Sequence, residues 1–106
     1  MTHGIKAAAV ILMAVLIAVP AFAQAPGADT YKAKCAMCHG ADGLAATTMG
    51  KNMKILSFKD PKMLSASDHQ FIVSTKDGLN KMPAYKGKLT DQQIKDVIDY
   101  IRTLQK

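Results

Sequence analysis

Cys35, Cys38 and His39 are the residues of this chain whose types and spacing could do chemistry. They stand in the stretch Lys34-Cys-Ala-Met-Cys-His-Gly40, which holds both cysteines of the chain. Two thiols at this spacing could form a disulfide, half of a zinc site, a thiol–disulfide redox pair or the anchor of a covalent cofactor. Each of these would give the protein a different function.

Their positions on a helix favour the covalent anchor. Cys35 and Cys38 would lie one turn apart and point the same way, with His39 four residues from Cys35 on nearly the same face. Two thiols on one face can bond two vinyl groups at one edge of a porphyrin, and the neighbouring imidazole can then reach the iron. C-x-x-C-H is accordingly the attachment signature of c-type haem.

The alternatives fit less well. A structural zinc site needs four protein ligands, and only His39 and His69 could join the two thiols. A thioredoxin-like pair needs a strand-rich βαβ setting, and no strand pattern is present in the sequence. A disulfide could form in an oxidising compartment but would stabilise so small a core only slightly. We therefore predict one covalent haem c, with a haem-free metal or thiol module as the alternative.

The iron of such a haem needs a second axial ligand, or else keeps an open site. Met82 is the predicted ligand, because Pro83 fixes φ and removes a backbone donor, which holds an extended segment that can lay a thioether against a flat ring. It lies 43 positions after His39, which is enough chain to reach the opposite face. Met49, Met53 and Met63 are expected to pack in the core or against the ring edge. Met37 lies within the motif, and His69 is expected to lie at the surface.

The first residues have the composition of a secretory signal peptide. Lys6 gives a positive start, the thirteen residues from Ala7 to Val19 are all apolar, and Ala21-Phe-Ala23 has the A-x-A form of a cleavage site. A membrane-spanning helix needs about 20 apolar residues, so an uncleaved anchor is the less favoured alternative. We expect residues 1–23 to be cleaved and the mature chain to be periplasmic, without stable membrane insertion.

Cleavage after Ala23 would leave the 83 residues 24–106, enough for one domain. They carry 13 Lys and Arg against 8 Asp, because Lys6 is lost, for a formal charge of +5. Spread lysines and few aromatic rings argue against a nucleic-acid partner, and a basic chain favours an acidic protein partner or a solvated face. A core this small usually needs a staple such as a cofactor.

Three segments predict helices, so we expect an all-α fold. The first spans roughly residues 27–39. The second follows the capping box Ser67-Asp-His-Gln70 and should end near Asp77-Gly78, because glycine commonly stands just past a helix. Residues 40–60 form a long connection that we expect to wrap around a cofactor. The third helix follows the capping box Thr90-Asp-Gln-Gln93, and its apolar residues repeat at helical spacing: Ile94, Val97, Ile98, Ile101 and Leu104.

With these features, the chain resembles the small bacterial class I cytochromes c of the c6, c551 and c553 types. The resemblance covers nearly all of residues 24–106 and is carried by residues 35–43, 81–85 and 89–101. It implies a monohaem cytochrome c domain in which three main helices wrap around one covalently bound haem. It also implies that the first helix crosses the last, with Gly27 and Tyr31 meeting Val97, Tyr100 and Ile101.

The resemblance implies a function as well. The chain would be a soluble single-electron carrier, not an enzyme, shuttling electrons as a monomer between respiratory or photosynthetic complexes, with His39 and Met82 as axial ligands. The lysines expected around the exposed haem edge, where redox partners with acidic docking surfaces would bind, are Lys34, Lys81, Lys86 and Lys88. An open or labile distal site, giving a peroxidase or gas sensor, is the alternative function.

The chain departs from the family in one respect. Many members have a proline about ten residues after the haem histidine, near a carbonyl that accepts from its Nδ1–H, but residues 43–60 contain no proline. We expect a backbone carbonyl between Ala46 and Gly50 to take this role. Candidate partners for the haem propionates are Lys51, Lys54, Ser57 and Lys59.

Overall fold

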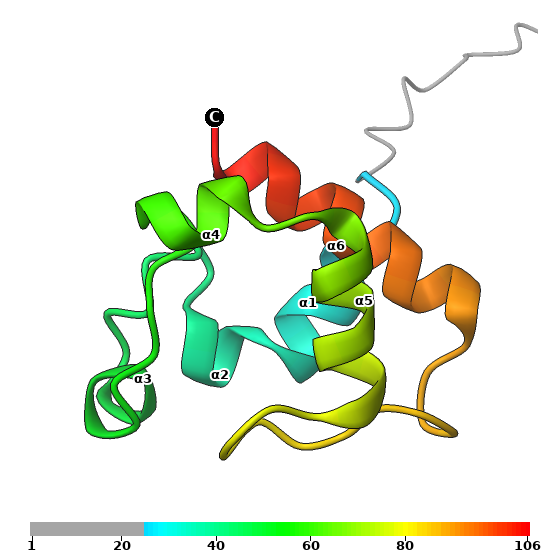
Figure 1. Ribbon diagram of the computed structural model, residues 1–106, viewed down its shortest axis with the longest axis horizontal. Helices are drawn as coiled ribbons and strands as arrows, with labels where there is room; N and C mark the ends of the chain where they lie inside the picture. Colours follow the sequence, from blue (N-terminus) through cyan, green and yellow to red (C-terminus); the bar gives the residue numbers. More distant parts are fainter. Residues whose placement is uncertain (1–24) are drawn as a thin grey trace, which may run out of the picture.

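The computed structural model describes residues 25–106, which contain six helices (Figure 1). They are α1 (Ala28–Lys34), α2 (Ala36–His39), α3 (Thr48–Asn52), α4 (Pro61–Ser65), α5 (Asp68–Asp77) and α6 (Asp91–Leu104). These residues contain two isolated β-bridges and no strands, which confirms the predicted all-α fold. Within them, no helix is long and apolar enough to cross a membrane. The predicted signal peptide, residues 1–23, lies outside the described residues.

The longest helix, α6, is fixed at its start by local sequence and along its length by burial. Thr90 Oγ1 accepts a hydrogen bond from Gln93 N–H, and the Gln93 side chain accepts one from Thr90 N–H, so the predicted capping box is present. The predicted apolar face is buried at Ile94, Val97, Ile98 and Ile101. Burial of each such side chain contributes about 2 kcal/mol, so α6 is the surface on which α1 and α5 pack.

Helix α1 crosses α6 at the predicted point. A Cβ atom on Gly27 would lie 2.7 Å from the backbone nitrogen of Val97, so a glycine is required for the two backbones to approach this closely. Tyr31 follows one turn later and is fully buried, with its ring centroid 5.3 Å from that of Tyr100. Tyr31, Phe58, Val97 and Ile101 form the core of the domain.

Helix α5 also has the predicted limits. Ser67 and Gln70 form a capping box at its start, and Gly78 follows its last residue with φ +79°. Two ion pairs connect α5 to α6: Arg102 with Asp68 at 2.9 Å and Lys76 with Asp91 at 3.0 Å. The chain reverses after Gly78, and this reversal sets the course of residues 78–90, which lead back to α6.

The first predicted helix, 27–39, is broken in the structure. It forms α1 and α2, which are separated at Cys35, where φ is −120° and ψ is −33°. Cys35 N–H still donates to Tyr31 O at 2.8 Å and His39 N–H donates to Cys35 O at 3.0 Å, so the two helices remain hydrogen-bonded through this residue. The break is local and leaves both cysteines next to the same junction.

Two short helices lie between α2 and α5. Helix α3 lies within residues 40–60, for which the sequence predicted only a long connection around a cofactor, and α4 follows directly after that segment. Five residues are too few to show an apolar period, so their sequence signals are the caps. Thr47 Oγ1 accepts from Gly50 N–H at 2.9 Å, and Asp60 Oδ1 accepts from Lys62 N–H at 2.9 Å with Pro61 at the first helical position. The starts of α3 and α4 are therefore fixed by their N-cap residues.

Candidate functional site

Helix α2, which ends at His39, is held by bonds from elsewhere in the fold. Four residues are too few to be stable as a helix on their own, and the carbonyls at a helix end lack intrahelical partners. Here the carbonyls of residues 38–40 all have partners: they accept from Thr47 Oγ1 at 2.9 Å, Ala45 N–H at 2.8 Å and the Tyr31 hydroxyl at 2.6 Å. The backbone that carries Cys38 and His39 is therefore fixed. Sequence reasoning did not foresee these three donors.

Helix α3 contacts this backbone directly at Gly50. A Cβ atom there would lie 2.5 Å from both Cys38 O and Ala45 O, which is far inside van der Waals contact. Only glycine allows α3 to pack this closely against α2. Gly50 is thus a structural residue of the site that the motif itself does not reveal.

Both cysteines have free thiols in the described structure and are half-buried. Burial raises the pKa of the Cys35 thiol to about 11, with a smaller contribution from Cys38. The thiolate is therefore disfavoured at this position. A thioether, which carries no charge, is suited to the same surroundings.

His39 is half-buried, and burial lowers the pKa of its imidazole. The neutral ring, the form that binds a metal ion, is thereby favoured. Its Nδ1 is buried and has no hydrogen-bond partner within the described residues. The ring is stacked on Phe58, with centroids 4.7 Å apart and planes 16° apart.

The expected carbonyl partner for His39 Nδ1, between Ala46 and Gly50, is not found. Carbonyls of this segment instead accept from helical or following N–H groups. Thr47 O accepts from Lys51 N–H at 2.9 Å, and Gly50 O accepts from Ile55 N–H at 2.9 Å. The prediction of this partner was therefore wrong.

Met82 lies in a tight turn of the connection from α5 to α6, residues 78–90, which we call the Met82 loop. Leu79 N–H donates to Met82 O at 3.2 Å and Met82 N–H donates to Leu79 O at 2.9 Å, with Asn80 left-handed at φ +53°. A Cβ atom on Gly78 would lie 2.8 Å from Met82 O. The Met82 backbone is therefore fixed against the end of α5.

Tyr85 connects the Met82 loop to the cysteine motif. Its hydroxyl donates to Lys34 O at 2.9 Å, across 51 residues of sequence. Its backbone N–H donates to Thr75 O at 2.9 Å and so ties the loop to α5 as well. The segment that carries Met82 and the segment that carries His39 therefore belong to one hydrogen-bonded assembly. The role of Tyr85 was not predicted.

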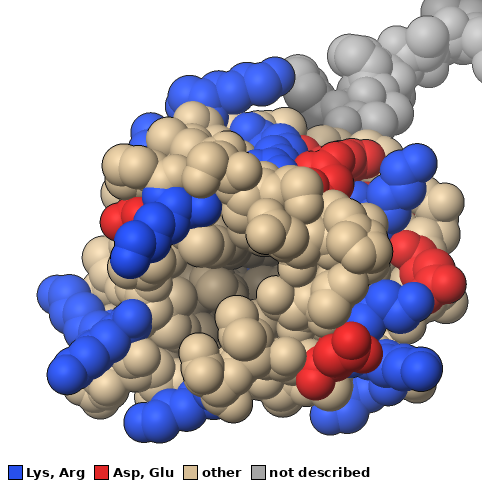
Figure 2. Space-filling model, viewed as in Figure 1, with Lys and Arg blue, Asp and Glu red and all other residues tan. Residues whose placement is uncertain are grey.

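A hollow opens on this face of the molecule. Figure 2 shows it bordered mainly by uncharged side chains, with lysines and arginines farther out, and in Figure 1 the same place is surrounded by α1, α2, α4 and α5. Three exposed apolar side chains lie on α4, α5 and the Met82 loop: Leu64, Val73 and Leu79. Apolar surface left open in this way fits a large apolar cofactor.

The remaining candidates are distributed as follows. Met37 and Met49 are exposed, Met53 is half-buried, Met63 packs against the core, and His69 is exposed on α5. Residues 25–106 contain no group of three or more His, Cys, Asp or Glu that could hold a metal ion, and so no zinc ligand set. The proposed propionate partners Lys51, Lys54 and Lys59 are exposed, and Ser57 Oγ accepts from Lys59 N–H at 3.0 Å.

Known proteins match this chain over most of its length. Residues 22–101 match the family described as cytochrome c oxidase, cbb3-type, subunit III. The chain is similar to cytochrome c6 of Nostoc sp. (37% identical, covering 71% of this chain and 65% of the relative) and of Synechococcus elongatus (35%, covering 73% and 85%). It is also similar to the cytochrome c subunit of a quinone alcohol dehydrogenase of Gluconacetobacter polyoxogenes (32%, covering 76% of this chain).

The chain spans only 19% of the length of that dehydrogenase subunit. Among solved structures it resembles the c-type cytochrome KustC0563, with a TM-score of 0.69 and 29% identity over 76% of this chain and 98% of the other. Together with the paired cysteines, these matches support one haem c, held covalently by Cys35 and Cys38. The chain belongs to the small class I c-type cytochromes.

Proposed function

We propose that this protein is an exported single-electron carrier of the periplasm, in which His39 and Met82 are the axial ligands of the haem iron. The observation that carries the proposal is the hydrogen bond from Tyr85 to Lys34 O, which ties the Met82 loop to the attachment motif. Two segments far apart in the sequence are thus joined where two ligands would be needed. The cytochromes c6 among its relatives give further support.

The residues of the site would have the following roles in electron transfer. When bound, the haem supplies a one-electron iron couple. His39 offers a neutral imidazole, because its burial lowers its pKa, and Met82 offers a thioether from a turn that is fixed at Gly78. With both axial positions filled, no coordination site would remain for a substrate, and the uncharged hollow would keep water away from the ring. These features favour outer-sphere electron transfer over a peroxidase or gas-sensing function.

The partner would be a redox protein with an acidic docking surface. Four exposed lysines belong to the segments next to the motif and Met82: Lys34, Lys81, Lys86 and Lys88. In Figure 2, Lys and Arg side chains lie around the hollow, with acidic side chains among them mostly on the right. Complementary charge of this kind raises association rates more than it raises affinity. We propose that the protein acts as a monomer in these encounters.

The ferric absorption spectrum tests the ligand assignment. A far-red charge-transfer band is expected for the native protein, because it arises only when methionine sulfur binds ferric haem. Met82→Ala should retain covalent haem and most of the helix content, lose this band, and gain affinity for cyanide. Met63→Ala is the matched control, because Met63 packs against the core, and it should keep the band.

Two results would contradict the proposal. Persistence of the band in Met82→Ala would show that Met82 is not the sulfur ligand. Absence of the band in the native protein, together with cyanide or peroxide binding as tight as in Met82→Ala, would favour the peroxidase or gas-sensor alternative.

A further inference from the structure

The imidazole of His39 lacks the support that a metal-binding histidine usually has. Such a histidine almost always donates its second ring N–H to an oxygen, which fixes the ring plane and raises the basicity of the ligand. Here Nδ1 is buried and has no hydrogen-bond partner among residues 25–106. The ring instead lies nearly parallel to that of Phe58, with centroids 4.7 Å apart. An aromatic ring therefore covers one face of the imidazole, while its Nδ1 edge has no hydrogen-bond partner among the described residues.

Phe58 is itself held firmly. Its side chain is 4% exposed, and its ring makes an edge contact with Phe71 at 6.1 Å between centroids. Its backbone is bound on both sides: Phe58 N–H donates to Gly43 O at 2.9 Å, and Phe58 O accepts from Gln105 Nε2 at 2.9 Å. The ring plane is thus fixed by packing and the backbone by hydrogen bonds.

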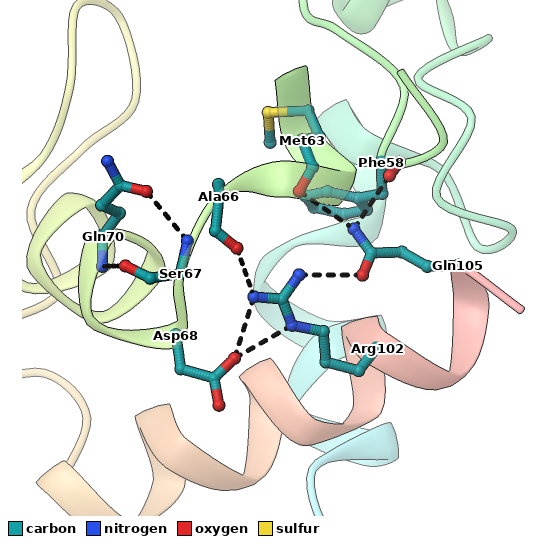
Figure 3. A network of polar contacts seen from close by, with 8 residues as sticks. All are labelled: Phe58, Met63, Ala66, Ser67, Asp68, Gln70, Arg102 and Gln105. Atoms are coloured by element: carbon teal, nitrogen blue, oxygen red, sulfur yellow. Dashed lines mark hydrogen bonds and ion pairs between the residues drawn. The ribbon is translucent and has the colours of Figure 1, made fainter. Parts of the chain in front are cut away.

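Gln105 is oriented in turn by Arg102, as Figure 3 shows. Arg102 Nη1 donates to Gln105 Oε1 at 3.0 Å, while its Nε donates to Asp68 Oδ1 at 2.9 Å and its Nη2 to Ala66 O at 2.6 Å. The guanidinium carbon also lies 4.5 Å from the centre of the Phe71 ring. All three guanidinium nitrogens thus donate hydrogen bonds, and these bonds hold the Gln105 side chain in one orientation.

We propose that Phe58 is a positioning residue that sets the ring plane of His39 as an iron ligand, and that Gln105 and Arg102 hold Phe58 in place. This inference rests on the proposed ligation by His39. Stacking fixes the plane without raising the basicity of the imidazole, as a hydrogen bond from Nδ1 would. A less basic ligand stabilises ferric iron less, so the arrangement favours a higher reduction potential.

Proton NMR of the ferric holoprotein tests the proposal, because the order and spread of the haem methyl shifts depend on the planes of the axial ligands. Phe58→Leu should change this pattern and lower the reduction potential, since the freed imidazole can turn and find an oxygen or water for Nδ1. Val97→Ala is the matched control. It removes a buried side chain from the same core cluster but no ring that contacts Phe58 or His39, so it should cost stability but leave the pattern nearly unchanged.

A second variant keeps the proposal testable if Phe58→Leu does not fold. Gln105→Leu removes the hydrogen bonds to Phe58 O and Met63 O from outside the ring cluster. It should shift the methyl pattern and the potential in the same direction, by a smaller amount. Unchanged methyl shifts in Gln105→Leu, or equal changes in Phe58→Leu and Val97→Ala, would overturn the inference. Missing hyperfine-shifted His39 ring protons in the native protein would instead contradict the proposed ligation.

Discussion

Tyr85→Phe removes one hydroxyl and with it the side-chain link between the Met82 loop and the attachment motif. That hydroxyl donates to Lys34 O at 2.9 Å. The aromatic ring remains, and so does the backbone bond from Tyr85 N–H to Thr75 O at 2.9 Å. The loop should therefore keep its fold in the variant but be held less firmly to the residue that precedes Cys35.

The size of the effect follows from the type of bond. A neutral hydrogen bond of this kind contributes about 1 kcal/mol net. Its loss should raise the equilibrium constant for detachment of the loop about fivefold, since 1.4 kcal/mol corresponds to a factor of ten. With Met82 as the proposed sixth ligand, cyanide would bind the ferric site only after Met82 has moved away, so its apparent affinity would report the population of the detached state.

A cyanide titration of the ferric protein therefore measures the prediction. The apparent dissociation constant should fall about fivefold in Tyr85→Phe, while the far-red band remains at neutral pH. Tyr100→Phe is the matched control. Of the three tyrosines, only Tyr31 and Tyr85 donate from their hydroxyls within the described residues, so removing the Tyr100 hydroxyl should leave cyanide binding unchanged.

Equal cyanide affinities in Tyr85→Phe and the native protein would refute the reasoning, because the hydroxyl would then not hold the loop. An equal gain in both tyrosine variants would contradict it in a different way. It would mean that removal of any such hydroxyl loosens the whole domain.

Three further predictions concern packing, pH and salt. Gly50→Ala should destabilise the domain by about 3 kcal/mol in urea unfolding, because its Cβ would meet two backbone oxygens at 2.5 Å. Gly87→Ala meets no neighbour and should cost only the left-handed strain of about 1 kcal/mol; equal losses would contradict the clash. Burial, then Cys35 and Cys38, raise the pKa of the Tyr85 phenol, and burial remains once the thiols are thioethers. The hydrogen bond from the Tyr85 hydroxyl should thus hold the Met82 loop below about pH 10 and be lost as pH rises through the raised pKa of the phenol. The cyanide affinities of native protein and Tyr85→Phe should therefore converge above that pKa. Electron transfer to an acidic partner should slow as salt rises, since screening acts over about 8 Å at physiological strength; a salt-independent rate would exclude such a partner.

The parts of the fold that the sequence predicted correctly are those with local causes. Helices α5 and α6 begin at capping boxes whose four residues are adjacent in the chain. The crossing of α1 and α6 was also predicted, from Gly27 and Tyr31, although by family resemblance and not from local pattern. The break at Cys35 was missed, because nothing in the residue types distinguishes one helix from two joined at a distorted residue.

The candidate site was also predicted only where its causes are local in sequence. The attachment chemistry could be predicted because its three residues lie within five positions of each other. The partner of His39 Nδ1 could not, because it depended on whether residues 46–50 form a loop or the helix α3. Phe58, Gly50 and Tyr85 act through contacts with residues distant in sequence, and their types alone are equally consistent with ordinary packing.

The contact between α1 and α6 has a consequence for the order in which the protein assembles. Tyr31 is fully buried, and it packs with Val97 and Ile101 near the other end of the chain. No stable core can form before that last helix has docked, because closing so long a loop costs entropy that only these late contacts repay. The thiols of the newly made chain therefore stay accessible throughout that interval. Connectivity alone favours covalent attachment first and packing afterwards.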